Sequence, residues 1–194
     1  YPLLTSDPEK AKSIIESKGY VMNEATGYYE KDGQELGLEI IGPEEPSLVA
    51  LGAIIVEQLQ AIGINAYQNF QPIPAFIDNN KSGNFGAEIF FMCGSVVDPW
   101  SPMSYYHVKH LTEPGVAHEH YFYNPMRWGT ESAQQYSDLV DQIEVLPIGD
   151  PAIDDLYLEA MGLWMPELPS IPLVLAPKLV PFNTTYWTGW PTID

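Results

Sequence analysis

The sequence predicts an α/β protein built on a mixed, mostly parallel sheet with helices on both faces. Three runs have strand-like composition, at 36–41, 64–70 and 88–93. The first two flank a helical segment, 47–62, whose apolar residues recur every three or four positions. This order predicts a βαβ unit with a right-handed crossover, and a shorter helical segment, 74–80, leads into the third run.

The amino-terminal part carries two local signals. Asp7 and Pro8 start a helix as N-cap and first helical residue, and Gly19 ends it. Its expected buried stripe consists of Ala11, Ile14 and Ile15. Asp32-Gly33, between strand-forming runs, predicts a hairpin that leads into the first strand of the main sheet.

The run 88–93 is almost continuously apolar, which is typical of a strand buried on both faces, so we expect it at the centre of the sheet. The segment that follows reaches Asp98, Pro99 and Trp100. Open α/β sheets bind ligands beyond the carboxyl ends of their strands. This segment is therefore the first candidate for a binding site, although Trp100 could instead only cover the sheet edge.

The rest of the chain is expected to be mostly helical. A long aromatic-rich loop spans 99–129, with a helical piece at 103–109. Helices are predicted over 131–143 and 150–164, followed by a last strand over 171–176, in which Pro172 indicates an edge or a strand start. The length of 194 residues favours one domain over the whole of 1–194.

Charge and cysteine content exclude some classes of function. A formal net charge of -18 argues against a nucleic-acid groove or an anionic membrane surface as partner. The single cysteine, Cys93, cannot form an internal disulfide and is expected in the core. No apolar run is long enough to span a membrane.

The four histidines lie close together in sequence, at His107, His110, His118 and His120. Their spacing could bring pairs of rings together, so a metal-binding protein or a hydrolase remains an alternative. No zinc signature, nucleophile motif or phosphate loop accompanies them. We therefore expect no catalytic residue, no metal and no cofactor.

Aromatic residues crowd the 99–129 loop and the carboxyl-terminal end. Flat rings with polar edges suit the faces of sugars, provided that hydrogen-bonding groups lie beside them. The alternative is that many of these rings pack over the sheet. The candidate ligand-binding residues are Asp98, Trp100, Asn124, Arg127, Trp128, Trp187 and Trp190.

Several segments together resemble a known family. They are the 7–20 helix with its Gly-Tyr end, Asp32-Gly33-Gln34, the Gln-Leu-x-x-Ile-Gly-Ile run within 56–65, and Asp98-Pro99. In this order they look like the second lobe of the ABC-transporter solute-binding proteins of the oligopeptide-binding class, family 5. The resemblance implies a periplasmic-binding-protein-like lobe, extracellular or periplasmic, anchored through a lipoprotein amino terminus of a longer parent chain. It also implies three partners: a small-molecule ligand, the permease subunits of an ABC importer and the first lobe of the same chain.

The resemblance also bears on the ligand. Peptide-binding members carry an acid, which holds the peptide's amino terminus, where this chain has Ser95-Val96-Val97. The end of the chain, Gly189-Trp190-Pro191-Thr192, is similar to a segment of the members that bind cellobiose and related oligosaccharides. We therefore expect a cello- or manno-oligosaccharide, with an oligopeptide or dipeptide as the alternative.

Overall fold

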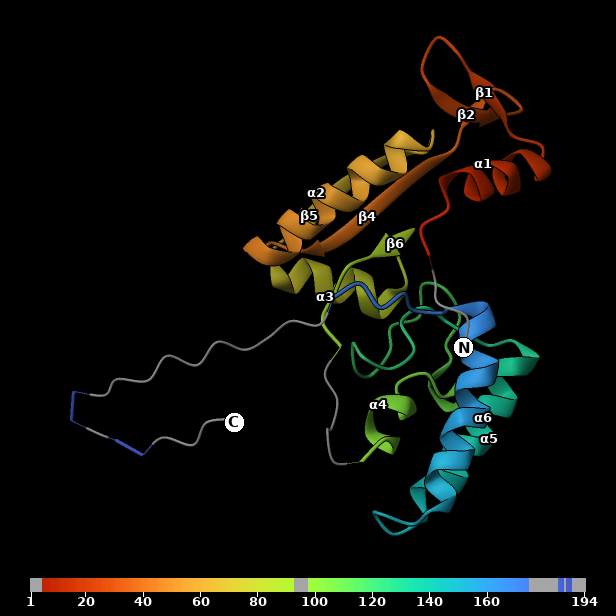
Figure 1. Cartoon of the computed structure of the whole chain (residues 1–194). Helices are drawn as coiled ribbons and strands as arrows, with labels where there is room; N and C mark the ends of the chain where they lie inside the picture. The colour runs from red at the N-terminus through yellow and green to blue at the C-terminus, as the bar shows by residue number, and fades with distance from the viewer. Residues whose placement is uncertain (1–4, 93–97, 175–184, 187, 190–194) are drawn as a thin grey trace.

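The computed structural model describes residues 5–92, 98–174, 185–186 and 188–189, and Figure 1 shows an α/β part connected to a mostly helical part. The elements within the described residues are, in order, α1 (Pro8–Ser17), β1 (Val21–Asn23), β2 (Tyr28–Lys31), β3 (Gln34–Glu35), β4 (Gly37–Pro43), α2 (Pro46–Ala61), β5 (Asn65–Gln71), α3 (Ile73–Ser82), β6 (Ala87–Glu88), α4 (Trp100–Ser104), the 3-10 helix η1 (Val108–His110), α5 (Glu131–Glu144) and α6 (Ala152–Glu167).

The main sheet is parallel and has the strand order β5-β4-β6. Leu38 lies opposite Ala66 on β5, and Ile41 lies opposite Glu88 on β6. Helix α2 packs on β4 and β5, and Figure 1 shows α3 on the other side of the same strands. The prediction that three strands share one sheet with the 47–62 helix packed on it is confirmed.

The prediction that the 88–93 run forms the central strand is wrong, because β4 lies in the middle of the sheet. In the described part of the run, strand pairing is limited to Ala87 and Glu88. Phe90, beyond the strand, packs against the rings of Phe76, Tyr121 and Phe122, with ring centroids 4.8, 5.8 and 5.8 Å apart. The apolar run thus continues from the edge of the sheet: Ile89 is buried in the sheet core, and Phe90 packs on both that core and the neighbouring rings.

One aromatic ring sets the distance between α2 and the sheet. Phe70 on β5 lies opposite Gly42 on β4, and a Cβ built on Gly42 would stand 2.5 Å from the Phe70 ring. A Cβ on Gly52 of α2 would stand 2.7 Å from the same ring. Phe70 therefore occupies the space that side chains at these two glycines would need.

The amino-terminal signals are largely confirmed. Asp7 accepts a hydrogen bond from the N–H of Lys10 at 3.0 Å and starts α1. Strands β2 and β3 pair antiparallel around Asp32 and Gly33, which both have positive φ, as a tight hairpin turn requires. The expected buried stripe of α1 is wrong: no residue of this helix is buried, and Ile14 is 50% exposed.

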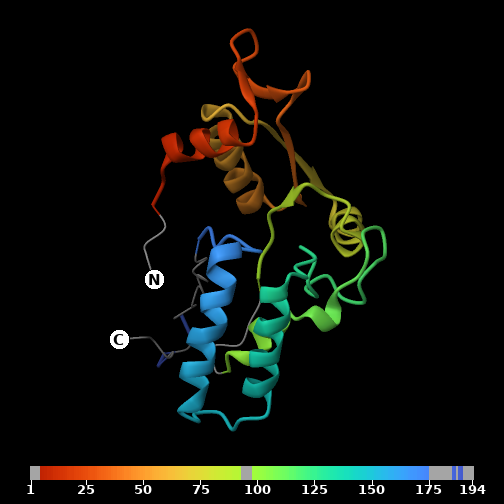
Figure 2. The same ribbon diagram turned by 90° about the vertical axis from the view of Figure 1, so that its right-hand side faces the viewer.

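Helices α5 and α6 lie side by side, as Figure 2 shows, and form a second core. Both were predicted, and the inward residues of α5 are those expected: Tyr136, Leu139, Val140 and Ile143. The predicted last strand is not formed over 171–174, which are exposed, and its remaining residues, 175 and 176, lie outside the described part of the chain. Among the described helices, none is long and apolar enough to cross a lipid bilayer.

Candidate functional site

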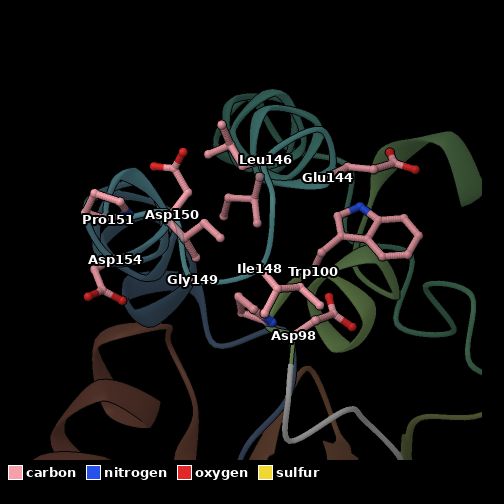
Figure 3. A pocket seen from close by; sticks show the side chains of 12 residues that line it. Asp98, Trp100, Glu144, Leu146, Ile148, Gly149, Asp150, Pro151 and Asp154 are labelled. Carbon is pink, nitrogen blue, oxygen red and sulfur yellow. The ribbon is translucent and has the colours of Figure 1, made fainter.

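A cavity of about 440 Å³ lies where the start of α4 meets the connection between α5 and α6 (Figure 3). Two of the predicted site residues, Asp98 and Trp100, belong to its wall. The other lining residues come from the end of α5, the connection and the start of α6: Pro99, Ile143, Glu144, Leu146, Ile148, Gly149, Asp150, Pro151, Ile153 and Asp154.

Asp98 is held at the start of α4. Its Oδ1 accepts a hydrogen bond from the N–H of Ser101 at 3.1 Å, which is the interaction of a residue that caps a short helix. An aspartate that directly precedes Pro99 and this helix can either cap the helix or accept hydroxyl protons from a ligand. The structure shows the first.

Trp100 provides the large ring of the cavity. It packs against the α5–α6 core, and the Nζ of Lys109 lies 5.9 Å from its ring centroid. Its Nε1 is buried and has no hydrogen-bond partner among the described residues. A buried indole N–H normally finds an acceptor, so this donor is an exception within the described part of the chain.

The wall of the cavity is acidic. Four carboxylates line it, from Asp98, Glu144, Asp150 and Asp154, and its described lining contains no basic side chain. Both oxygens of an ionised carboxylate accept hydrogen bonds and donate none. Apolar side chains from Ile143, Leu146, Ile148 and Ile153 lie between them. The arrangement can thus receive a molecule with hydroxyl or ammonium donors and an apolar face.

Asn124 and Trp128 do not line the cavity. Asn124 is fully buried, accepts the Trp128 N–H at 2.8 Å and donates to the Trp128 carbonyl oxygen at 2.9 Å. Trp128 is 6% exposed, and its Nε1 donates to Glu167 at 2.6 Å. In this structure the two predicted ligand residues hold the loop together and connect it to the end of α6.

Arg127 also makes bonds within the protein. Its guanidinium donates to the carbonyl oxygens of Pro125, Lys81 and Val116 at 3.0, 3.2 and 3.2 Å. Lys81 belongs to the last turn of α3, where carbonyl groups lack partners within the helix, so Arg127 caps this helix from the 99–129 loop. Of the predicted site residues, Trp187 and Trp190 lie outside the described part of the chain.

The cavity residues that sequence reasoning missed come from the α5–α6 connection. Leu146, Ile148, Asp150 and Asp154 are about fifty positions from Asp98 in the chain, so spacing could not bring them to the same site. One signal was available. The connection between the two predicted helices contains the apolar residues Val145, Leu146 and Ile148 close together in the sequence, in a segment where a solvated loop is mostly polar.

The histidines make separate contacts rather than one shared site within the described part of the chain. The Nε2 of His107 lies 3.0 Å from Asp141 Oδ1, and its Nδ1 accepts the N–H of Lys109. His110 stacks on Tyr123 with centroids 3.9 Å apart, and burial, assisted by the positive charge of Lys109, lowers the pKa of His110 to about 4. Among the described residues, no group of three or more His, Cys, Asp or Glu could hold a metal ion.

No family model and no curated protein matches this sequence. The fold is similar to several solved structures. A periplasmic oligopeptide-binding protein from Thermotoga maritima, bound to mannohexaose, has a TM-score of 0.70 and 22% identity over 87% of this chain and 31% of its own. An oligopeptide-binding protein from Thermus thermophilus with a pentapeptide has a TM-score of 0.65 and 19% identity over 89% and 30% of the two chains. NikZ from Campylobacter jejuni with Ni(L-His) has a TM-score of 0.67 and 18% identity over 85% and 31%.

These neighbours are binding proteins rather than enzymes, and this chain spans about a third of the length of each. At identities of 18–22%, the similarity establishes the architecture. The resemblance drawn from the sequence is confirmed at that level: the chain has the α/β fold of a lobe-sized segment of the periplasmic solute-binding proteins of the oligopeptide-binding class.

Proposed function

We propose that the chain is a non-catalytic, ligand-binding lobe of an extracellular solute-binding protein that captures an oligosaccharide and delivers it to an ABC importer. The observation that carries this proposal is the cavity beside Trp100, on a fold whose neighbours include a mannohexaose-bound protein. We propose a ligand of the cello- or manno-oligosaccharide type.

The chemistry of the cavity supports a sugar. A sugar ring presents C–H groups on its faces and hydroxyl groups at its rim, so it suits an indole face with acceptors alongside. Trp100 provides the indole, and Asp98, Glu144 and Asp154 provide carboxylate acceptors for hydroxyl protons. The unpartnered Nε1–H of Trp100 can donate to a hydroxyl or ring oxygen.

The site residues then take different roles. Asp98 and Trp100 contact the ligand, whereas Asn124, Arg127 and Trp128 keep the 99–129 loop in the position that supports the wall. Trp187 and Trp190 remain proposed ligand residues, on the similarity of their segment to the cellobiose-binding members. This division of roles modifies the sequence prediction, which named all seven as candidate ligand-binding residues.

The proposal extends to the parent protein. We propose that 1–194 forms one lobe, that a first lobe provides the opposite wall, and that the importer's permease subunits receive the ligand. The parent would act in the periplasm or outside the cell, anchored as a lipoprotein. Because a ligand held between two lobes has half its contacts on each, the isolated chain should bind only weakly.

Nuclear magnetic resonance of the ¹⁵N-labelled chain tests the proposal. Mannohexaose or cellohexaose at millimolar concentration should shift the Trp100 indole N–H signal, assigned by its loss in Trp100→Phe. In the parent, Trp100→Ala should weaken sugar binding by about 1–3 kcal/mol, roughly 5- to 150-fold, if the ring stacks as other aromatic platforms do. Tyr157→Ala is the matched control, because Tyr157 is an exposed ring on α6 that does not line the cavity.

A peptide is the second candidate, and the four carboxylates favour it, because an ammonium group is also a strong donor. The same titration with a pentapeptide separates the two. If the pentapeptide shifts the Trp100 signal and neither hexasaccharide does, the sugar assignment fails while the binding-lobe assignment stands. If none of the three ligands binds the parent protein, the solute-binding assignment fails as well.

A further inference from the structure

A carboxylic acid and an amide meet at a partly buried position between α3 and the main sheet. Glu88, the last residue of β6, lies against Asn80 on α3, and Asn80 is fully buried. The Asn80 Nδ2 is 2.8 Å from Glu88 Oε2 and 3.1 Å from Oε1. The Oδ1 of Asn80 is buried and has no hydrogen-bond partner among the described residues.

Among the described residues, Asn80 alone donates hydrogen bonds to the Glu88 carboxyl group. On β4 its neighbour in register is the apolar Ile41. From the 99–129 loop, the charge of Arg127 acts on Glu88, but the guanidinium donates its hydrogen bonds to three carbonyl oxygens. Lys81 on α3 and His118 of the loop lie around Arg127, and burial together with Arg127 lowers the pKa of His118, which favours its neutral form.

The protonation state of Glu88 decides whether this contact is fully hydrogen-bonded. Among the described residues, an ionised Glu88 has only the Asn80 NH₂ as donor, and it has no proton to give to the Asn80 Oδ1, which then stays without a partner. A neutral acid can donate its O–H to Oδ1 and accept from Nδ2 once the amide has turned so that both of its polar atoms face the acid. The pair then has two hydrogen bonds and leaves no atom of the amide without a partner.

We propose that Glu88 and Asn80 form a proton-dependent latch, in which neutral Glu88 fastens α3 to β6 through two hydrogen bonds and loss of its proton loosens that contact. Burial, the largest cause, raises the pKa of Glu88 to about 7, whereas the Asn80 hydrogen bond and the charge of Arg127 act in the opposite direction. The proton therefore leaves near neutral pH rather than in the acidic range of an exposed glutamate.

The direction of the effect on stability follows from the raised pKa. Between the unfolded pKa, which is about 4.5 for a free glutamate side chain, and about 7, the folded state binds more protons than the unfolded state. The contribution of the latch is complete below the unfolded pKa and is lost as the pH rises through the folded pKa.

Thermal unfolding of the whole chain between pH 5 and 8 tests the latch with two variants. Glu88→Gln keeps the shape of the neutral acid and has no proton to lose, so its Tm relative to wild type should rise by about 5–10 °C from pH 5 to pH 8. Glu57→Gln, at an exposed position of α2, is the matched control and should keep the wild-type pH profile. The comparison with wild type removes the contribution of all other titrating groups.

A second measurement observes the proton directly. The side-chain carboxyl carbon of Glu88, assigned in ¹³C spectra by its absence in Glu88→Gln, should titrate near pH 7. A midpoint below pH 5, a Glu88→Gln profile parallel to wild type, or failure of Glu88→Gln to fold would each overturn the latch. These outcomes do not depend on a ligand, so the proposed function stands or fails separately.

Discussion

The side-chain amide of Asn124 forms two hydrogen bonds with the backbone of Trp128. The Oδ1 of Asn124 accepts the Trp128 N–H at 2.8 Å, and its Nδ2 donates to the Trp128 carbonyl oxygen at 2.9 Å. Asn124 has a φ of 46°, a left-handed conformation that asparagine tolerates better than most residues. One side chain thus closes the turn that carries Arg127 and brings Trp128 into the α5–α6 core.

Replacement of this amide should be costly. Asn124→Ala leaves a buried N–H and a buried carbonyl without partners and retains the left-handed backbone, so we expect a loss of about 2–4 kcal/mol in the free energy of unfolding. Urea denaturation measures this loss. Asn69→Ala removes an exposed amide that bonds to Glu39 and should cost less than about 1 kcal/mol. Equal losses in the two variants would contradict the structural role of Asn124.

Alanine substitutions at Gly83 and Gly115 should distinguish the cost of backbone strain from the cost of a steric clash. Gly83 and Gly115 both have positive φ, at 64° and 85°, but a Cβ on Gly83 would stand 2.0 Å from Arg127 Nη1, whereas a Cβ on Gly115 would meet nothing within 4 Å. Gly115→Ala should therefore cost about 1 kcal/mol for the backbone alone. Gly83→Ala should cost about 1–3 kcal/mol more, because Arg127 must leave its carbonyl partners. Similar losses in urea denaturation would show that Arg127 can move freely.

Glu167 should stabilise the protein in a pH-dependent way. The hydrogen bond from Trp128 is the largest cause that lowers the pKa of Glu167, and the hydrogen bond from Thr130 acts in the same direction. Both favour the charged form of the carboxyl group. A lowered folded pKa gives a contribution that is present above the unfolded pKa of about 4.5 and is lost as the pH falls through the folded value.

Glu167→Gln should therefore unfold at a lower urea concentration than wild type at pH 7, and the difference should shrink as the pH falls from about 5 to about 3. Glu159→Gln, also exposed on α6, is the control and should show no such convergence. A difference that stays constant with pH would mean that the charge of Glu167 has no part in the contact.

The histidines should not form a tight zinc site. Both ring nitrogens of His107 already have protein partners, and His110 is stacked on Tyr123. Zinc needs three or four converging ligands. Calorimetry at pH 7 should detect no binding below about 1 μM, and His107→Ala/His110→Ala should give the same weak signal as wild type. Submicromolar binding that this double variant abolishes would revive the metal-binding alternative.

The elements that were predicted correctly are those with local signals. Asp7 and Pro8 are sufficient to start α1, Asp32 and Gly33 to turn a hairpin, and the apolar periodicity of 47–62 to define α2. The order of strands in the sheet depends on contacts between distant segments. The position of the 88–93 run was therefore mistaken, because β4 lies between β5 and β6 in the sheet, an order that no local pattern in the sequence encodes.

The candidate site was predicted only in part for a similar reason. Asp98 and Trp100 follow a strand, and their place could be inferred from the sequence. Composition does not distinguish a ring that faces a ligand from a ring that fills a core, so Trp128 was assigned to the site although it is buried. The opposite wall, from Leu146 to Asp154, depends on how α5 and α6 pack beside α4, which no local pattern encodes.

Phe70 and the two glycines that face it imply a rule for sequence divergence. Neither Gly42 nor Gly52 can gain a side chain while the ring stands between strand and helix, so the three positions must change together. A homologue with alanine at either glycine should carry a smaller residue in place of Phe70. Linked substitutions of this kind would identify chains that share the same helix-to-sheet spacing even where other similarity has been lost.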